Sequence, residues 1–536
     1  GPARCVLVAT EASLAAVRAR AIAHLETGAP AGRGVFFRER PIVGEIAFAF
    51  AGAGASYRGM GRALLLHLPQ LHEHLRTRSR RLATALDWSF VASDVTASVF
   101  EQLCGSSALS QLHLALSEGV LGLKADAWLG YSSGETNALI AAGVWNDADA
   151  LMDDMASSGL LERELAGRFD VLARAWGEPA SWECWTVAAP IDDVRRALAG
   201  LDRLRIAIIN DDASCLIAGD AAQCGIVVER LGATRCLHLD YSLVVHVPEL
   251  RGVESAWLDV HRRATSTPRR GRVYSTASGR PYTPDSEACA QAILAQAVDT
   301  IDIRALVENA WNDGVRVFVV HGPGGTFGRA IRHVLGTREA LVVSLDRQGD
   351  GIETVLGATA ALLAAGVAVD HAALEAALAP VPRVEPKRPR RFDAHPPPVR
   401  LPSREDAVQT MAPAPRLPAI LERASLEGPT LDGMRREPVV VALPVAAVPR
   451  VASSSMRASH PALEGIRAEL ARLAAAQQAF TQAQTNAHAQ YLALQAKATD
   501  VLLRAGRHGA IPLATPSPSL WREQGASVSV VETLVQ

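Results

Sequence analysis

The sequence lacks the paired cysteines that would hold a metal or build a disulfide framework. Its 536 residues contain 7 cysteines, an odd number scattered along the chain without a C-x-x-C pair, which favours a reducing, cytoplasmic compartment. The sequence also lacks a charge bias, because 54 basic and 56 acidic side chains leave a net charge of −2. Neither nucleic acid nor an acidic membrane is therefore an expected partner, and no metal site is expected.

The chain has no apolar stretch long enough to span a bilayer. The longest run, residues 354–369, has 16 residues between Glu353 and Asp370, whereas a membrane helix needs about 20. The run is typical of a buried helix, and membrane insertion is not expected. Hydrophobic residues make up 49% of the chain and charged residues 21%. This composition predicts a globular protein with a large core.

Changes of composition divide the chain. From Ile46 to about Val369, short β-like runs alternate with longer helical patterns, which is typical of a largely parallel α/β sheet. Between Pro380 and Pro418 lie 11 of the 30 prolines, which exclude regular structure there. We expect five segments: an N-terminal linker (1–34), a main domain (35–375), a proline-rich linker (376–458), a long amphipathic helix (459–506) and a tail (507–536). The helix could pack on the main domain or self-associate, and its pattern favours neither.

Residues 127–135, AWLGYSSGE, join an apolar strand to a helical pattern through a G-x-S-x-G turn. The two glycines allow a sharp bend that exposes Ser132 at the end of the strand, beside the N–H groups of the following helix. This arrangement predicts a nucleophile elbow. Two other glycine turns, at residues 52–56 and 322–325, lack the remaining features of nucleotide-binding loops, so a nucleotide is not expected.

Four motifs in order resemble the acyltransferase domain of polyketide and fatty-acid synthases, which has the malonyl-CoA:ACP transacylase fold. They are the G-x-S-x-G-E of 130–135, the glycine turns at 52–56 and 322–324, and the helix ending in V-D-H over 354–371. Four further stretches are most similar to the acyltransferase domains of polyunsaturated fatty acid synthases: 38–50, 130–139, 240–249 and 394–399.

The resemblance implies a fold and a set of partners. The fold would have an α/β-hydrolase-like core with a parallel sheet and a ferredoxin-like small subdomain inserted at about 180–245. The substrate would be a thioester of coenzyme A or phosphopantetheine, and no cofactor would be bound. An acyl carrier protein and neighbouring synthase domains would be the partners.

The resemblance also implies roles for individual residues. Ser132 would be the nucleophile and His246 the general base, which Asp299 would orient through either its carboxylate or its main-chain carbonyl. The backbone N–H groups of Ala53 and Ser133 would form the oxyanion hole, where losing one donor typically costs about 10²- to 10³-fold in rate.

The predicted substrate pocket departs from the family pattern. The arginine that holds the malonate carboxylate in the family corresponds to Ser157 here. An unpaired buried charge costs about 3 to 5 kcal/mol, so malonyl should be disfavoured by roughly a hundredfold or more unless Arg163 or another arginine reaches the pocket. Tyr131 replaces a family histidine, Val244 and Val245 lie in the tetrapeptide that accompanies substrate choice, and Asn210 matches a family asparagine. These residues predict an apolar pocket for an acyl group without a free carboxylate.

Two other functions remain open from the sequence. A thioesterase-like hydrolase would use the same acyl-serine with water as acceptor and would serve editing or chain release. A non-catalytic structural domain is the second alternative, because the family glutamine at the first glycine turn is Ala53 here.

Overall fold

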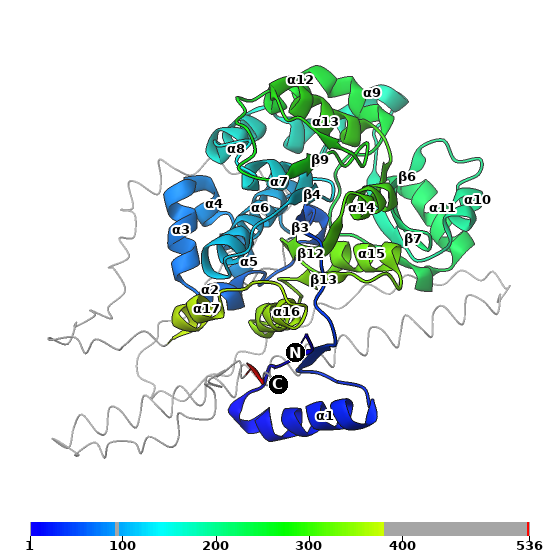
Figure 1. The fold of residues 1–536 in the computed structure, drawn as a ribbon. Helices are drawn as coiled ribbons and strands as arrows, with labels where there is room; N and C mark the ends of the chain where they lie inside the picture. The colour runs from blue at the N-terminus through cyan, green and yellow to red at the C-terminus, as the bar shows by residue number, and fades with distance from the viewer. Residues whose placement is uncertain (1, 92–95, 380–532, 535–536) are drawn as a thin grey trace, which may run out of the picture. The chain divides into compact units, whose positions relative to one another are not determined.

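A computed structural model describes residues 2–91, 96–379 and 533–534 (Figure 1). These residues belong to one compact unit of the chain, which comprises residues 1–382 and 522–536. The proline-rich linker expected over 376–458 lies outside the described residues beyond 379. The same holds for the helix expected over 459–506 and for the tail over 507–536 except residues 533–534.

A six-stranded sheet forms the centre of the larger part of the fold. Its order is β10-β9-β4-β3-β12-β13, and all neighbours are parallel except β10, which is antiparallel to β9. The strands are β3 (Glu45–Phe50), β4 (Ala127–Gly130), β9 (Arg272–Tyr274), β10 (Pro281–Tyr282), β12 (Val315–His321) and β13 (Leu341–Ser344). Phe48, Phe50, Trp128 and Phe318 are wholly buried, as expected for a parallel sheet covered on both faces.

Helices cover the two faces of this sheet. In Figure 1, α6 and α7 lie against one face and α14 and α15 against the other. The apolar run noted in the sequence forms α16, which contacts β13. The helices of this part are α2 (Arg62–His67), α3 (Gln70–Arg78), α4 (Arg80–Thr84), α5 (Asp87–Phe90), α6 (Val99–Leu114), α7 (Gly134–Ala141), α8 (Ala148–Ser157), α9 (Asp170–Trp176), α12 (Glu254–His261), α13 (Ser286–Val298), α14 (Ile303–Asn312), α15 (Thr326–Leu335), α16 (Glu353–Ala364) and α17 (His371–Leu378).

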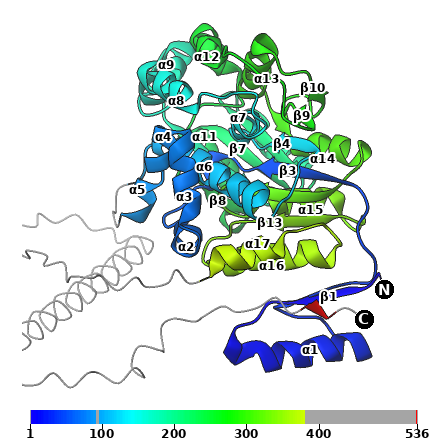
Figure 2. The same cartoon turned by 60° about the vertical axis from the view of Figure 1, so that its left-hand side comes forward.

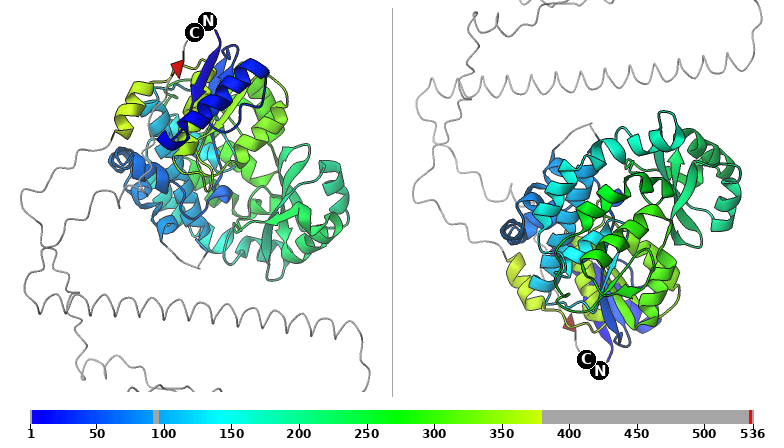
Figure 3. Two further views of the ribbon diagram at one scale, coloured as in Figure 1. Left: turned by 90° about the horizontal axis from the view of Figure 1, so that it is seen from below. Right: turned by 90° about the horizontal axis from the view of Figure 1, so that it is seen from above.

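Residues 182–238 form a smaller α/β subdomain with its own core, built on side chains such as Val194, Ile217 and Val227. Its chain order is β5 (Trp182–Val187), α10 (Ile191–Ala197), β6 (Leu204–Asp211), β7 (Ser214–Asp220), α11 (Ala221–Leu231) and β8 (Cys236–His238). The four strands are antiparallel in the order β6-β7-β5-β8, and β11 (Ile301–Asp302) adds a parallel strand beside β6. Both views of Figure 3 show this subdomain as a lobe beside the large sheet.

The N-terminal residues form a third, small sheet. β1 (Arg4–Leu7) pairs antiparallel with β2 (Val35–Arg38) and with β14 (Thr533–Leu534). The helix α1 (Leu14–Thr27) packs on β1 and β2 (Figure 2), and Leu7, Val17 and Val35 are buried between them. The expected boundary at residue 34 therefore falls inside this sheet, because β2 pairs with the predicted linker. Among the residues that the structure describes, no helix has both the length and the apolar character to cross a membrane.

Candidate active site

The turn between β4 and α7 brings Ser132 to the edge of the large sheet. Ser132 has a φ of 55°, a left-handed conformation that non-glycine residues seldom adopt outside functional sites. The flanking glycines are required by close packing. A Cβ at Gly130 would lie 2.1 Å from the Glu135 nitrogen, and one at Gly134 would lie 2.0 Å from the Phe50 oxygen. The local sequence thus forms the elbow that the G-x-S-x-G pattern predicts.

His246 meets Ser132 from a loop more than a hundred residues further along the chain. Its Nε2 lies 2.8 Å from Ser132 Oγ, and its Nδ1 lies 2.6 Å from the main-chain oxygen of Gln296. Because a carbonyl oxygen can only accept, Nδ1 carries the proton and the Nε2 of the neutral ring accepts from the serine hydroxyl. His246 also has a positive φ of 62°, and its own N–H donates to the Ala297 oxygen. Two bonds to the end of α13 therefore hold the ring toward Ser132.

Burial sets the protonation state of this histidine. His246 is only 4% exposed, and the cost of burying a charge lowers the pKa of its imidazole to about 4 despite the opposing hydrogen bond to Gln296. The imidazole is neutral at neutral pH as a result. The pair can therefore perform nucleophilic attack with general-base assistance.

The residue that orients His246 differs from the sequence-based expectation. Asp299 lies three residues after Gln296 at the end of α13, and its carboxylate accepts from the N–H of Thr300. The side chain of Asp299 is not among the groups that bond the imidazole. The orienting group is the main-chain carbonyl of Gln296, so the expected chemistry is present at a different residue.

The two backbone amides predicted to form the oxyanion hole belong to Ala53 and Ser133, and a side chain already bonds to one of them. Ser133 Oγ accepts from the Ala53 N–H at 3.0 Å, while the Ser133 N–H makes no hydrogen bond within the described residues. The Gly52 turn packs closely on the elbow, since a Cβ there would lie 2.7 Å from the Tyr131 oxygen. The two expected donors are thus neighbours, with the Ser133 hydroxyl beside them.

The buried carboxyl group of Glu135 links the elbow to Gln296, whose main-chain oxygen orients His246. Glu135, in the first turn of α7, accepts from the Thr276 N–H at 2.9 Å and from Gln296 Nε2 at 3.3 Å. Burial raises the pKa of Glu135 to about 7, although the bonds from Thr276 and Tyr282 act in the opposite direction. Sequence reasoning gave this glutamate no role beyond its place in the motif. Its spacing three residues after Ser132 is the signal that could have found it.

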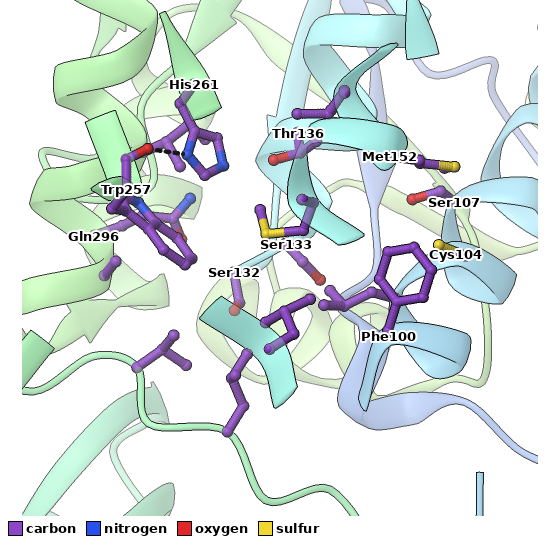
Figure 4. A pocket seen from close by; sticks show the side chains of 18 of the residues that line it. Phe100, Cys104, Ser107, Ser132, Ser133, Thr136, Met152, Trp257, His261 and Gln296 are labelled. Carbon is purple, nitrogen blue, oxygen red and sulfur yellow. Dashed lines mark hydrogen bonds between the residues drawn. The ribbon is translucent and has the colours of Figure 1, made fainter. Parts of the chain in front are cut away.

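Two hollows meet at Ser132 and His246. The first, which we call the acyl chamber, extends between α6, α7, α8, α12 and α13, and its apolar walls include Phe100, Met152 and Trp257. Figure 4 shows Ser132 at one side of this space. The second, which we call the cleft, lies between the Gly52 turn and the sheet of the small subdomain, and it includes Tyr131 and Asn210. A bound thioester could thus place its carbonyl at Ser132 with room on both sides.

Comparison with known proteins shows the family. Residues 47–369 match the acyl transferase domain family. The chain belongs to this family.

Curated relatives of this acyl transferase domain are long synthases. It is 24% identical over 343 residues to a polyunsaturated fatty acid synthase polypeptide of Thraustochytrium sp., covering 58% of this chain and 17% of that protein. It is 27% identical over 370 residues to the phenolphthiocerol synthesis polyketide synthase type I Pks15/1 of Mycobacterium marinum, covering 66% and 16%. The chain therefore spans less than a fifth of the length of either relative.

Solved structures show the same fold. The acyltransferase domain from the second module of the salinomycin polyketide synthase has a TM-score of 0.56 and 24% identity, over 69% of this chain and 85% of that one. The domain from module 8 of the same synthase has a TM-score of 0.52 and 20% identity, over 66% and 83%.

The acyl transferase domain brings only some of the predicted pocket residues to the hollows. Tyr131 and Asn210 line the cleft and are joined by a 2.7 Å bond from Tyr131 Oη to Asn210 Oδ1, and Val245 lines both hollows. Val244 lines neither hollow, because its side chain is wholly buried in the core. Ser157 does not either, since it ends α8 with an exposed side chain that bonds to the Asp154 oxygen. Met152 and Met155 of the same helix face the chamber instead.

Among the described residues that line the acyl chamber and the cleft, none is an arginine or lysine. Arg163 is the nearby arginine that could have replaced the malonate-binding arginine of the family. Its side chain is exposed and lies over Gly159. Within the part of the chain that the structure describes, no cluster of three potential metal ligands occurs.

Proposed function

We propose that the protein is a serine-dependent acyltransferase that moves an acyl group without a free carboxylate to a carrier-protein thiol. The observation that carries this proposal is the line of hydrogen bonds from Ser132 through His246 to the Gln296 carbonyl, at the mouth of a chamber without cations. The acyl group would come from a thioester of coenzyme A or phosphopantetheine, and the reaction needs no bound cofactor.

The first half-reaction forms an acyl-serine. His246 Nε2 takes the Ser132 proton as Oγ attacks the thioester carbonyl carbon, and the Ala53 and Ser133 amides bind the resulting oxyanion. The C–S bond then breaks, and the leaving thiolate takes the proton from His246. In the second half-reaction a carrier-protein thiol gives its proton to His246 and attacks the ester carbon. Ser132 Oγ leaves and regains the proton.

The architecture supports the same proposal. We infer an α/β-hydrolase-like core from the elbow at the end of a parallel strand. We infer a ferredoxin-like small subdomain from the βαββαβ order of residues 182–238. The cleft between the two parts would admit a phosphopantetheine arm from a carrier protein, and the relatives' length suggests that further synthase domains flank this one.

Because no described residue that lines the acyl chamber is an arginine or lysine, the proposed substrate class can be tested. Without a cation in the acyl chamber, a malonyl carboxylate would be buried unpaired, which costs about 3 to 5 kcal/mol. We expect octanoyl-CoA to label Ser132 roughly a hundredfold faster than malonyl-CoA does. Intact mass of the wild-type protein and of Ser132→Ala measures both rates, and equal or faster labelling by malonyl-CoA would refute the proposed selectivity.

The same measurement separates the alternatives. Transfer requires the adduct on Ser132 to persist until carrier protein is added and then to move to its thiol. Free acid released without carrier protein would indicate a hydrolase. An absence of adducts with every thioester tested would indicate a structural domain and would overturn the proposed function.

A further inference from the structure

The acyl chamber is largely apolar, with a few polar side chains in its wall, among them Ser107 and Gln296. Its walls include Phe100, Met152 and Ile293, but His261 on α12 and Thr136 on α7 also line it. Figure 4 shows the imidazole of His261 and the hydroxyl of Thr136 on opposite sides of the open space above Ser132. His261 is a buried side chain, and a buried polar atom without a partner requires a reason, because it is destabilising.

The hydrogen bonding of His261 defines what it can bind. Its Nδ1 lies 2.7 Å from the Trp257 main-chain oxygen, and since a carbonyl only accepts, Nδ1 carries the ring proton. Burial lowers the pKa of His261 to about 4, helped by the charge of Arg263, which keeps the ring neutral. Nε2 therefore presents a lone pair, and it makes no hydrogen bond within the described residues. The side chain is 3% exposed, so this acceptor faces the chamber rather than bulk solvent.

Thr136 is the second polar side chain of the pair. It lies in the first turn of α7, four residues after Ser132, and its hydroxyl likewise has no partner among the residues described. A hydroxyl can donate and accept. The two side chains together can hold one group that both donates to His261 and bonds to Thr136.

We propose that the acyl chamber selects an acyl group carrying a hydroxyl near its thioester end, with His261 Nε2 as the acceptor and Thr136 on the opposite side of the space. A ketone or a carboxylate offers no hydrogen to Nε2, and an unsubstituted chain leaves Nε2 unpaired. A 3-hydroxyacyl thioester, whose hydroxyl is two carbons from the carbonyl at Ser132, represents this class of substrate in the test. The inference rests on the proposed acyl transfer and narrows its substrate class.

The test compares two thioesters of equal length, 3-hydroxyoctanoyl-CoA and octanoyl-CoA. We expect the hydroxylated thioester to acylate Ser132 of the wild-type protein about tenfold faster, the ratio that one net hydrogen bond supports. His261→Phe keeps an aromatic ring of similar size without the acceptor and should bring the ratio close to one. His261→Gln retains an acceptor oxygen and should recover part of the preference, and Thr136→Val should lower it.

Ser107→Ala is the matched control, because Ser107 lines the same chamber on α6, away from this pair. Its ratio should equal that of the wild type, and thermal unfolding of each variant checks that it is folded. Equal rates for the two thioesters with the wild type, or a preference unchanged in His261→Phe, would overturn this inference and leave acyl transfer intact. Failure of both thioesters to label Ser132 would instead overturn the proposed function.

Discussion

The Ser133 hydroxyl accepts a hydrogen bond from the Ala53 N–H at 3.0 Å, at the amide expected to bind the oxyanion. In the proposed mechanism the residue after the nucleophile would thus supply one amide of the oxyanion hole, while its side chain bonds to the other amide. An oxyanion that binds both amides must displace this hydroxyl. The bond therefore belongs to the resting enzyme and opposes the first step of the reaction.

Replacing Ser133 with alanine should speed acylation. The change frees the Ala53 amide and leaves the backbone N–H of residue 133 in place. A neutral hydrogen bond contributes about 0.5 to 1.5 kcal/mol, which corresponds to a rise of about two- to tenfold in the acylation rate. Stopped reactions followed by intact mass would measure the rate. A fall of tenfold or more would show that the hydroxyl donates to the oxyanion.

Substitutions at the end of α13 should separate the carbonyl of Gln296 from the carboxylate of Asp299. Gln296→Ala keeps the main-chain oxygen that orients His246, so the rate should stay within about tenfold of wild type. Asp299→Asn should change it less than twofold. His246→Ala should lose at least the 10²- to 10⁴-fold that a general base contributes. A hundredfold loss of rate in Asp299→Asn would show that the Asp299 carboxylate does orient His246.

The pH dependence of kcat/KM should show the buried state of His246. The base works in its neutral form, and burial lowers its pKa to about 4. Activity should therefore rise with pH through about 4 and be nearly constant from about 5.5 to 6.5, where an ordinary histidine would still be titrating. Initial rates in buffers of constant ionic strength test this. A half-maximal rate near pH 6.5 that persists in Glu135→Gln would contradict it.

Glu135 should make the fold less stable as the pH rises. Its pKa is raised from 4.5 in the unfolded chain to about 7 in the fold, so the folded state holds the proton more tightly between these values. The contribution is fully present below pH 4.5 and is lost as the pH passes 7, a change of about 3 kcal/mol.

Glu135→Gln removes this titration and provides the measurement. The free energy of unfolding in urea, taken at several pH values from 4.5 to 8, should fall for the wild type relative to the variant. Subtracting the two curves cancels the buried histidines, which act in the opposite direction. A difference that does not vary with pH would mean that the carboxyl ionises normally in the fold.

The elbow could be predicted from sequence because its constraints are local. Gly130 and Gly134 are required by atoms within the turn and the adjacent strand, so the motif carries its own geometry. The orienting group of His246 is different, since a main-chain carbonyl can come from any residue type. The identity of Gln296 therefore left no signal, and the family resemblance implied Asp299, through either its carboxylate or its carbonyl.

The residues that line the pocket also could not be predicted fully from the sequence. Counting forward from Ser132 leads to Ser157, but the count does not show whether this side chain meets the chamber, because that depends on how α8 packs. In the segment before His246, Leu243 and Val245 line the hollows while Val244 enters the core. Periodicity predicts which residues share a side, and only the tertiary packing decides which side is the pocket.

The bond between Tyr131 and Asn210 joins the elbow to the small subdomain. Chimeric enzymes made by exchanging residues 182–238 between related synthases would inherit one partner from each parent. Such grafts should work best when both parents carry a compatible pair at these two positions, so the pair is a practical criterion for choosing donors in domain engineering.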